Sequence, residues 1–117
     1  MIIVAGTGSI RPADHSAGFA ALHKMSAVTQ SEAGCLEYRF AVSLDDPEGI
    51  DVFECWADQA ALDAHLASAH TVEFGEALAQ FMAPDSLRLT RYEVSDSAPF
   101  PAAAEVEVED EGAGEAD

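Results

Sequence analysis

The chain has 117 residues, of which 49% are hydrophobic, and this is enough for one domain with a modest core. It carries 22 acidic residues and five Lys or Arg, for a formal net charge of −17 at pH 7. Such a surface repels phosphate backbones and anionic lipids, so we expect neither nucleic acid nor a membrane as a partner. The first ten residues lack a basic leader and no apolar run is long enough to span a membrane, which predicts a cytoplasmic protein.

The acidic residues are unevenly distributed along the chain. From Asp96 onward there are eight acidic residues and no Lys or Arg, and Pro and Ala interrupt the segment. A segment of this composition cannot bury enough apolar surface to offset the entropy lost on ordering. We therefore predict a folded domain over residues 1–95 and an acidic, disordered C-terminal tail over residues 96–117.

The first half of the domain alternates between strand and helix patterns. Residues 1–10 are rich in β-branched side chains and predict a strand, and residues 12–32 repeat apolar side chains at helical spacing. Residues 35–43 alternate between polar and apolar, with Leu36 and Tyr38 on the same face. A turn rich in Asp, Pro and Gly follows, and residues 50–57 predict the returning strand of a β-hairpin.

The second half predicts a broken helix and a final strand. Asp58 is placed as an N-cap, and apolar side chains recur at helical spacing through residues 58–82, with a break near Ser68. This spacing puts His65 on the buried face of the first helical part. Residues 86–94 predict the last strand.

The order strand, helix, strand, strand, broken helix, strand predicts an α+β fold of the ferredoxin-like split βαβ type. Its four-stranded antiparallel sheet would carry helices on one face only. The other face would then expose apolar side chains over an area that is unusual for a monomer. We therefore expect a homodimer in which two such sheets pack face to face into an α+β barrel, and two-fold dimers are the commonest symmetric form.

Two segments carry a resemblance to a known family. They are G-C-L-E-Y-R-F-A-V-S-L-D-D-P at residues 34–47 and V-F-E-C-W-A-D-Q-A-A-L-D-A-H-L-A-S-A-H at residues 52–70. These segments are similar to the antibiotic biosynthesis monooxygenase (ABM) family of small dimeric α+β-barrel proteins, which includes quinol monooxygenases. The resemblance covers residues 1–94 and implies an oxidoreductase that uses dioxygen without any cofactor, because the substrate supplies the electrons.

Such a reaction needs an apolar cavity for an aromatic ring, a base and groups that stabilise an anion. The resemblance points to Trp56, His65 and His70 as the catalytic candidates, with the indole and the imidazole of His65 bordering one apolar pocket between sheet and helices. The candidate substrate-binding residues, which would form the pocket wall or balance the charge of a phenolate, are Tyr38, Leu66, Phe74, Leu78, Phe81 and Arg91.

The sequence offers no motif for a metal or haem. His65 and His70 are five residues apart across a helix break, without HxxxH or HExxH spacing, and Cys35 and Cys55 are isolated. The haem-degrading relatives place their haem ligand at the position that Gly75 occupies here. We therefore expect neither a metal nor a haem.

Other interpretations of these residues stay open. His65 can be a hydrogen-bonded core histidine, and Trp56 a core residue rather than a pocket wall. The chain can then be a non-catalytic dimeric protein that binds a small ligand or serves as an accessory domain. An isomerase of a small polar substrate is a further alternative, and a cavity lined by charged groups would favour it.

Overall fold

The structure is a computed structural model, and it describes residues 1–101. The predicted acidic tail begins inside this range at residue 96, and the rest of it, residues 102–117, lies outside the described residues. In chain order the elements are β1 (Ile2–Ser9), the 3₁₀ turn η1 (Pro12–Asp14), α1 (His15–Thr29), β2 (Cys35–Val42), β3 (Gly49–Trp56), α2 (Gln59–Ala67), α3 (Ala69–Phe81) and β4 (Arg88–Glu93).

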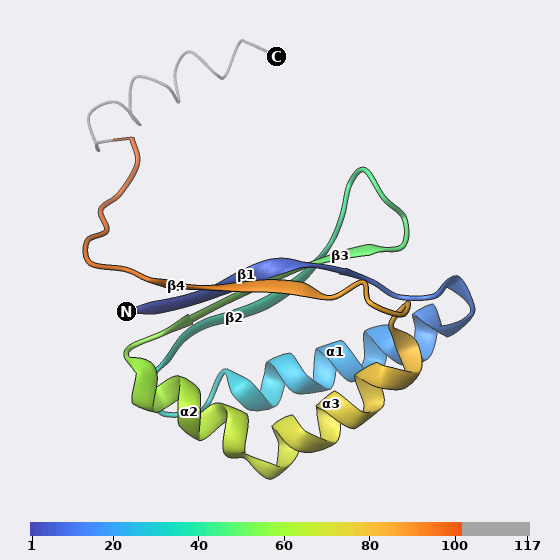
Figure 1. Cartoon of the computed structure of the whole chain (residues 1–117), viewed down its shortest axis with the longest axis horizontal. Coiled ribbons are helices and arrows are strands. Elements are labelled where there is room, and N and C mark those ends of the chain that lie inside the picture. Colours follow the sequence, from blue (N-terminus) through green and yellow to red (C-terminus); the bar gives the residue numbers. More distant parts are fainter. Residues whose placement is uncertain (102–117) are drawn as a thin grey trace.

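The four strands form one antiparallel sheet in the order β2-β3-β1-β4, and the helices cover one of its faces (Figure 1). This confirms the predicted α+β, ferredoxin-like arrangement. None of the helices in the described part of the chain is long and apolar enough to cross a membrane.

The register of β2 differs from the predicted alternation. A β-bulge between Cys35 and Glu37 pairs Cys35 with Trp56 and Glu37 with Cys55. The extra residue is Leu36, which is exposed, so the prediction that it shares the face of Tyr38 was wrong. A bulge inserts one residue without a partner and shifts the alternation by one residue, and the apolar side chain of Leu36 conceals this shift in the sequence.

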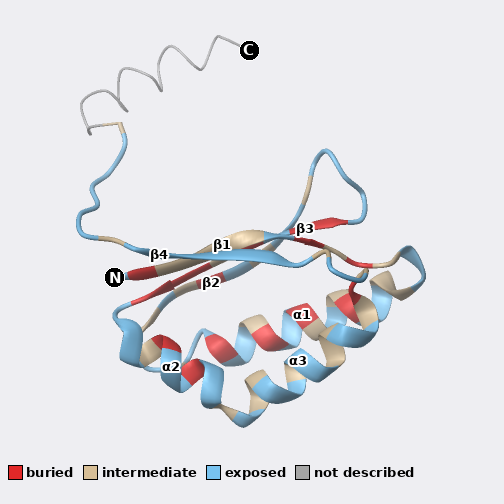
Figure 2. Ribbon diagram, in the orientation of Figure 1, coloured by how far each residue is buried: buried red, intermediate tan, exposed pale blue. Residues whose placement is uncertain are grey.

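The core lies between the sheet and the helices in two clusters of buried side chains (Figure 2). Trp56, at the end of β3, is the largest side chain that is fully buried. The cluster around it contains Ile2, Met25, Tyr38, Trp56 and Leu62. The cluster toward the opposite end of the sheet contains Ile10, Leu22, Ile50 and Met82.

The predicted break between the last two helices is confirmed at Ser68. This residue has an extended backbone, with φ −71° and ψ 150°, so α2 ends there and α3 begins. Its hydroxyl donates to the carbonyl of His65 at 2.7 Å and accepts from the backbone N–H of Thr71 at 3.3 Å. One side chain therefore adds a hydrogen bond to a carbonyl at the end of the first helix and caps a free N–H at the start of the second.

Gly6 marks the closest approach between two strands. A Cβ placed on this residue would lie 1.8 Å from the backbone oxygen of Arg88, beside β4. We expect Gly6→Ala to lower the free energy of unfolding by about 1–3 kcal/mol, the usual cost of overpacking, because the strands would have to separate. Urea unfolding followed by circular dichroism measures this change.

Gly75 is the matched control for this substitution. It lies inside α3, and a Cβ there would meet nothing within 4 Å. Gly75→Ala is therefore expected to raise the free energy of unfolding by roughly 0.5–1 kcal/mol, since alanine is the better helix former. Equal effects of the two substitutions would contradict the close approach at Gly6.

Candidate active site

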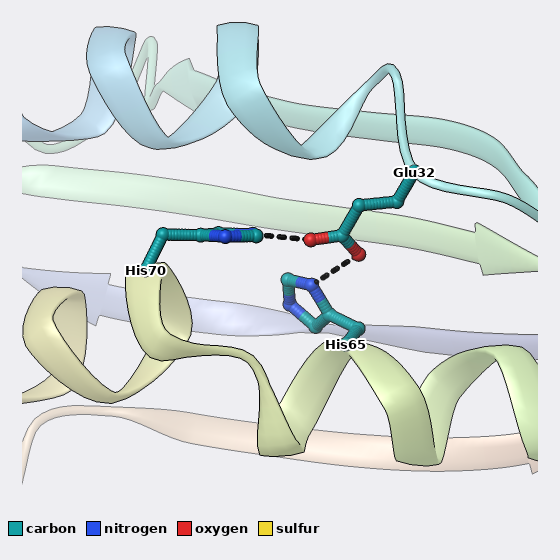
Figure 3. A group of neighbouring side chains, drawn as sticks. All are labelled: Glu32, His65 and His70. Atoms are coloured by element: carbon teal, nitrogen blue, oxygen red, sulfur yellow. Dashed lines mark hydrogen bonds and ion pairs between the residues drawn. The ribbon is translucent and has the colours of Figure 1, made fainter.

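Three ionisable side chains from three different segments meet beneath the sheet (Figure 3). His65 belongs to the last turn of α2, His70 to the first turn of α3, and Glu32 to the connection between α1 and β2. The break at Ser68 is what turns the two histidines toward the same carboxylate, although they lie on different helices.

Glu32 contacts both imidazoles, one at each carboxylate oxygen. His65 Nδ1 donates a hydrogen bond to Oε1 at 2.9 Å, and His70 Nε2 lies against Oε2, which accepts no hydrogen bond from the described residues (Figure 3). The side chains of His65, Glu32 and His70 are 3%, 18% and 31% exposed, respectively. In this triad of side chains His65 is buried, His70 is partly exposed, and the Glu32 carboxylate lies between them.

Two aromatic rings hold His65 on its other sides. Its ring centroid lies 4.7 Å from that of Trp56, with the planes tilted by 35°, and 5.4 Å from that of Tyr38. The structure thus brings together the indole and imidazole that the sequence singled out, and adds Tyr38 to them. The contacts with these two aromatic rings and the hydrogen bond to Glu32 fix the orientation of the His65 imidazole.

A second buried carboxylate, Glu54, supports the indole. Its Oε1 accepts from Trp56 Nε1 at 3.0 Å. Burial raises the pKa of the Glu54 carboxyl, while the bond from Trp56 and the nearby His65 pull it down in part. Burial also raises the pKa of the Tyr38 hydroxyl, and the negative charges of Glu54 and Glu32 add to that effect. Tyr38 therefore stays a neutral phenol and a potential hydrogen-bond donor at physiological pH.

His70, the most exposed residue of the triad, lies at a groove between α1 and α3. This cavity has a volume of about 280 Å³, and His70 lines it together with Lys24, Met25, Glu73 and Phe74, among others. His70 is thus the histidine that a ligand in this groove can touch.

The predicted shared pocket is not formed in the described residues 1–101. Trp56 is fully buried and His65 nearly so, and neither lines the groove or the other two cavities. The space between them is filled by their own contact and by Tyr38 and Leu62. A largely apolar cavity of about 300 Å³ does lie between α1 and the sheet, but it is lined by residues such as Phe19 and Phe40 and by none of the predicted catalytic residues.

The remaining predicted substrate-binding residues separate into two groups. Phe74 lines the groove beside His70 and packs against both core clusters. Leu66 is 56% exposed, and Leu78 and Phe81 pack against the cluster of Ile10 rather than that of Trp56. The structure does not bring these three to His65.

Arg91 also lies away from the triad. It is exposed on the edge strand β4, where its Nε donates to Gln59 Oε1 at 2.7 Å. An arginine held there by the start of α2 does not reach the groove beside His70. Its predicted role of balancing a phenolate has no support in this arrangement.

Glu32 and Glu54 are the functional candidates that sequence reasoning missed. Glu54 precedes Trp56 by two residues, so the alternation of a strand already placed both on one face. Glu32 has no comparable signal, because 33 residues separate it from His65. Only the packing of the α1–β2 connection against the α2–α3 corner brings it into the site.

The triad has two chemical capabilities. A carboxylate that orients an imidazole is the arrangement found behind general bases, because it fixes the ring and stabilises the cation that forms when the ring takes a proton. The ligand atoms of Glu32, His65 and His70 also all lie within 4.8 Å of one another, so these residues are the group in the described chain that can hold a metal ion.

Comparisons with known proteins agree on one family. A family model described as "Antibiotic biosynthesis monooxygenase" matches residues 1–77. A solved structure from Deinococcus radiodurans, provisionally named an antibiotic biosynthesis monooxygenase, has a TM-score of 0.78 and 26% identity, over 85% of this chain and 97% of that one. The protein Rv0793 of Mycobacterium tuberculosis has a TM-score of 0.75 and 26% identity, over 84% and 98% of the two chains.

A curated relative is less informative about function. It is an uncharacterized protein of Synechocystis sp. that is 34% identical over 76 residues, which are 64% of this chain. The match covers 51% of that protein, so the chain spans about half the length of the curated relative it matches.

Glu54 makes the stability of the fold depend on pH. Its raised pKa means that the folded protein keeps this proton at pH values where the unfolded chain, with an ordinary value of 4.5, has lost it. The contribution of Glu54 to the free energy of unfolding therefore falls as pH rises above 4.5 toward the raised pKa. Glu54→Gln keeps an oxygen for the Trp56 N–H and cannot ionise, so its stability relative to wild type is expected to increase from pH 4.5 to pH 7.

Urea unfolding at a series of pH values measures this difference. Glu76→Gln is the control, because Glu76 is exposed on α3, and its difference from wild type should stay flat. A flat or falling difference for Glu54→Gln would show that the buried carboxyl does not hold its proton in the folded state.

Proposed function

Because the chain belongs to the antibiotic biosynthesis monooxygenase family, we propose that it is a monooxygenase that oxidises a quinol or polycyclic phenol with dioxygen. The observation that carries the proposal is the carboxylate-oriented His70 at the wall of the α1–α3 groove. A monooxygenase in general is what the family and its solved members support. The phenolic substrate and the roles of individual residues are our proposal.

The reaction begins with removal of the phenolic proton. The phenolate then reduces dioxygen, and a peroxide forms at a ring carbon that bears a hydrogen, ortho or para to the phenolate oxygen. Loss of the hydrogen from that carbon, with cleavage of the O–O bond, leaves a quinone and releases water. One oxygen atom enters the ring, the other leaves as water, and the substrate supplies all four electrons. The protein then needs no redox cofactor, only a base and a site that holds the anion.

His70 is placed to act as the base. Its Nε2 lies against Glu32 Oε2, so a neutral ring that carries its proton on Nε2 has the lone pair of Nδ1 available to accept a proton. A phenol in the groove would lie against Met25 and Phe74, which supply apolar contact for its ring. Lys24 lines the same groove and can balance the phenolate, the role that the sequence had suggested for Arg91.

Glu32 and His65 are positioning residues in this proposal. Glu32 stabilises the imidazolium that forms on His70, and the bond from His65 holds the other carboxylate oxygen in place. Trp56 and Tyr38 in turn hold His65 by packing against its ring. Glu32 and His65 thus orient His70 and do not touch the substrate themselves.

We propose further that two copies associate through the open face of the sheet. Ile3 lies beside both Cys55 and Tyr92 on that face, and Phe53 lies next to them, paired with Ala5. Among the described residues no helix covers this face (Figure 1). An uncovered surface that contains a phenylalanine, a tyrosine and an isoleucine is typical of an interface.

Non-catalytic binding of a small apolar ligand is the second candidate function. It is favoured by the cavity between α1 and the sheet, which includes Phe19, Leu22 and Phe40 in its lining and lies apart from the triad. Binding of a ligand in this cavity would not require a general base. This candidate predicts binding that is insensitive to substitution of His70.

His70→Ala is expected to lower kcat/KM for quinol oxidation by about 10²–10⁴, the usual contribution of a general base. Oxygen uptake with a panel of naphthols and anthracene-type phenols measures it, and anaerobic incubation should abolish product formation. His23→Ala is the matched control, because His23 is exposed on α1 and lines a different cavity. Turnover that persists without dioxygen, or equal rates for the two variants, would refute the proposal.

Phe53→Asp is expected to convert the dimer to monomers, because it replaces an apolar ring of the interface with a carboxylate that would lose hydration between the paired sheets. Light scattering after size exclusion gives the mass. Phe100→Asp is the control, since that side chain is almost fully exposed and lies beyond the sheet. A wild-type chain that elutes as a monomer would rule out the dimer.

A further inference from the structure

We propose that Glu32, His65 and His70 bind a divalent transition-metal cation such as Zn²⁺, and that the bound cation prevents His70 from acting as a base. The first half of this inference rests on the geometry of the triad alone. The second half rests on the proposed function. It runs against the expectation from the sequence, where the spacing of the histidines indicated no metal.

The donor set suits this class of ion. Two imidazole nitrogens and one carboxylate oxygen form a ligand set that binds zinc and other first-row divalent metals in proteins, with further positions left to water. The three residues come from three segments that the fold holds together, rather than from one flexible loop.

The distances are close to those of a metal site. Zinc lies about 2.0–2.2 Å from nitrogen and oxygen ligands, so two ligand atoms of one zinc are about 3–3.5 Å apart. His65 Nδ1 and Glu32 Oε1 are 2.9 Å apart, and all the ligand atoms lie within 4.8 Å of one another. Small rotations of the side chains are enough to complete the site, and His70, the most exposed of the three, is the one freest to move.

The surroundings favour a cation. Glu32 lies directly beside both imidazoles, and the whole chain is strongly acidic. Two hydroxyl groups lie beside the proposed ligand nitrogens, with Thr71 Oγ1 3.3 Å from His65 Nδ1 and Ser68 Oγ 3.3 Å from His70 Nε2, so the site is polar on this side as well. The α1–α3 groove, which His70 lines, provides an entry path and room for water on the metal.

Metal binding and proton transfer exclude one another at this site. The ion would lie between Glu32 and the two ring nitrogens that now face it, His65 Nδ1 and His70 Nε2, and any proton displaced would be released to solvent. The Glu32 carboxylate would then be bound to the metal and no longer stabilise an imidazolium on His70. His70 would carry its remaining proton on Nδ1, which leaves it no free lone pair for a substrate proton.

Titration of the metal-stripped, full-length protein with Co²⁺ and Zn²⁺, in the absence of substrate, tests the site. We expect one ion per chain by calorimetry and a visible Co²⁺ absorption band that Zn²⁺ displaces. Glu32→Gln and His70→Ala should each weaken Zn²⁺ binding at least 10–100-fold, roughly the loss seen even for residues that only support a metal ligand. Circular dichroism checks that both variants fold.

Glu73→Gln is the matched control. Glu73 lines the same groove as His70 but lies outside the triad, so its substitution should leave Zn²⁺ affinity unchanged. Absence of saturable binding, or equal affinity in wild type and Glu32→Gln, would overturn the metal site.

Oxygen uptake with and without Zn²⁺ tests the inhibitory half separately. We expect Zn²⁺ at saturating concentration to suppress turnover and a chelator to restore it. If no phenol is turned over, the proposed function fails while the calorimetry still decides the metal site. Turnover that rises with Zn²⁺ would overturn the inhibition and leave the binding intact.

Discussion

The carboxylate of Glu32 is the interaction on which the site depends. It contacts two imidazoles that belong to different helices: His65 Nδ1 donates to its Oε1, and His70 Nε2 lies against its Oε2. This places a negative charge at the junction of α1, α2 and α3, where only charge-assisted bonds can offset its partial burial. Without it, His65 would be a closed imidazole with no acceptor for its Nδ1 proton other than the Thr71 hydroxyl.

Burial divides the site into a rigid part and a reactive part. Trp56, Tyr38 and His65 are enclosed, and their rings contact one another beneath the sheet. His70 is partly exposed and reaches the groove between α1 and α3. A base that is open to a ligand but oriented by buried groups combines access with fixed geometry, which proton transfer requires.

The same donors that suit proton transfer also suit a metal ion. A metal ion on Nε2 of His70 leaves the ring proton on Nδ1, the nitrogen that would accept the substrate proton, so the two proposed uses of His70 compete. Which use prevails depends on the metal that is available. The acidic character of the chain strengthens the attraction for cations at every pH at which the carboxylates are ionised.

The sequence by itself determined the elements and their order. β-Branched alternation, the N-cap at Asp58 and the break at Ser68 are local signals, because each depends on neighbours within a few residues, and the structure contains all of them. The pairing of Trp56 with His65 also followed, since each residue lay on the buried face of its own element. The bulge at Leu36 was missed because Leu36 is apolar and continues the alternation of Tyr38 and Phe40, which hides the shift of phase that the inserted residue causes.

Only the tertiary structure decided what the site contains. Glu32 joins His65 across 33 residues through the packing of a connection against a helix corner, and no spacing rule reports a contact of that range. Leu66 and Arg91 were assigned to the site from their residue types. In the structure Leu66 lies on the exposed side of α2, and Arg91, on the edge strand β4, donates a hydrogen bond to Gln59. Periodicity tells which face of an element a side chain occupies. Which other element meets that face is set by how the whole chain packs.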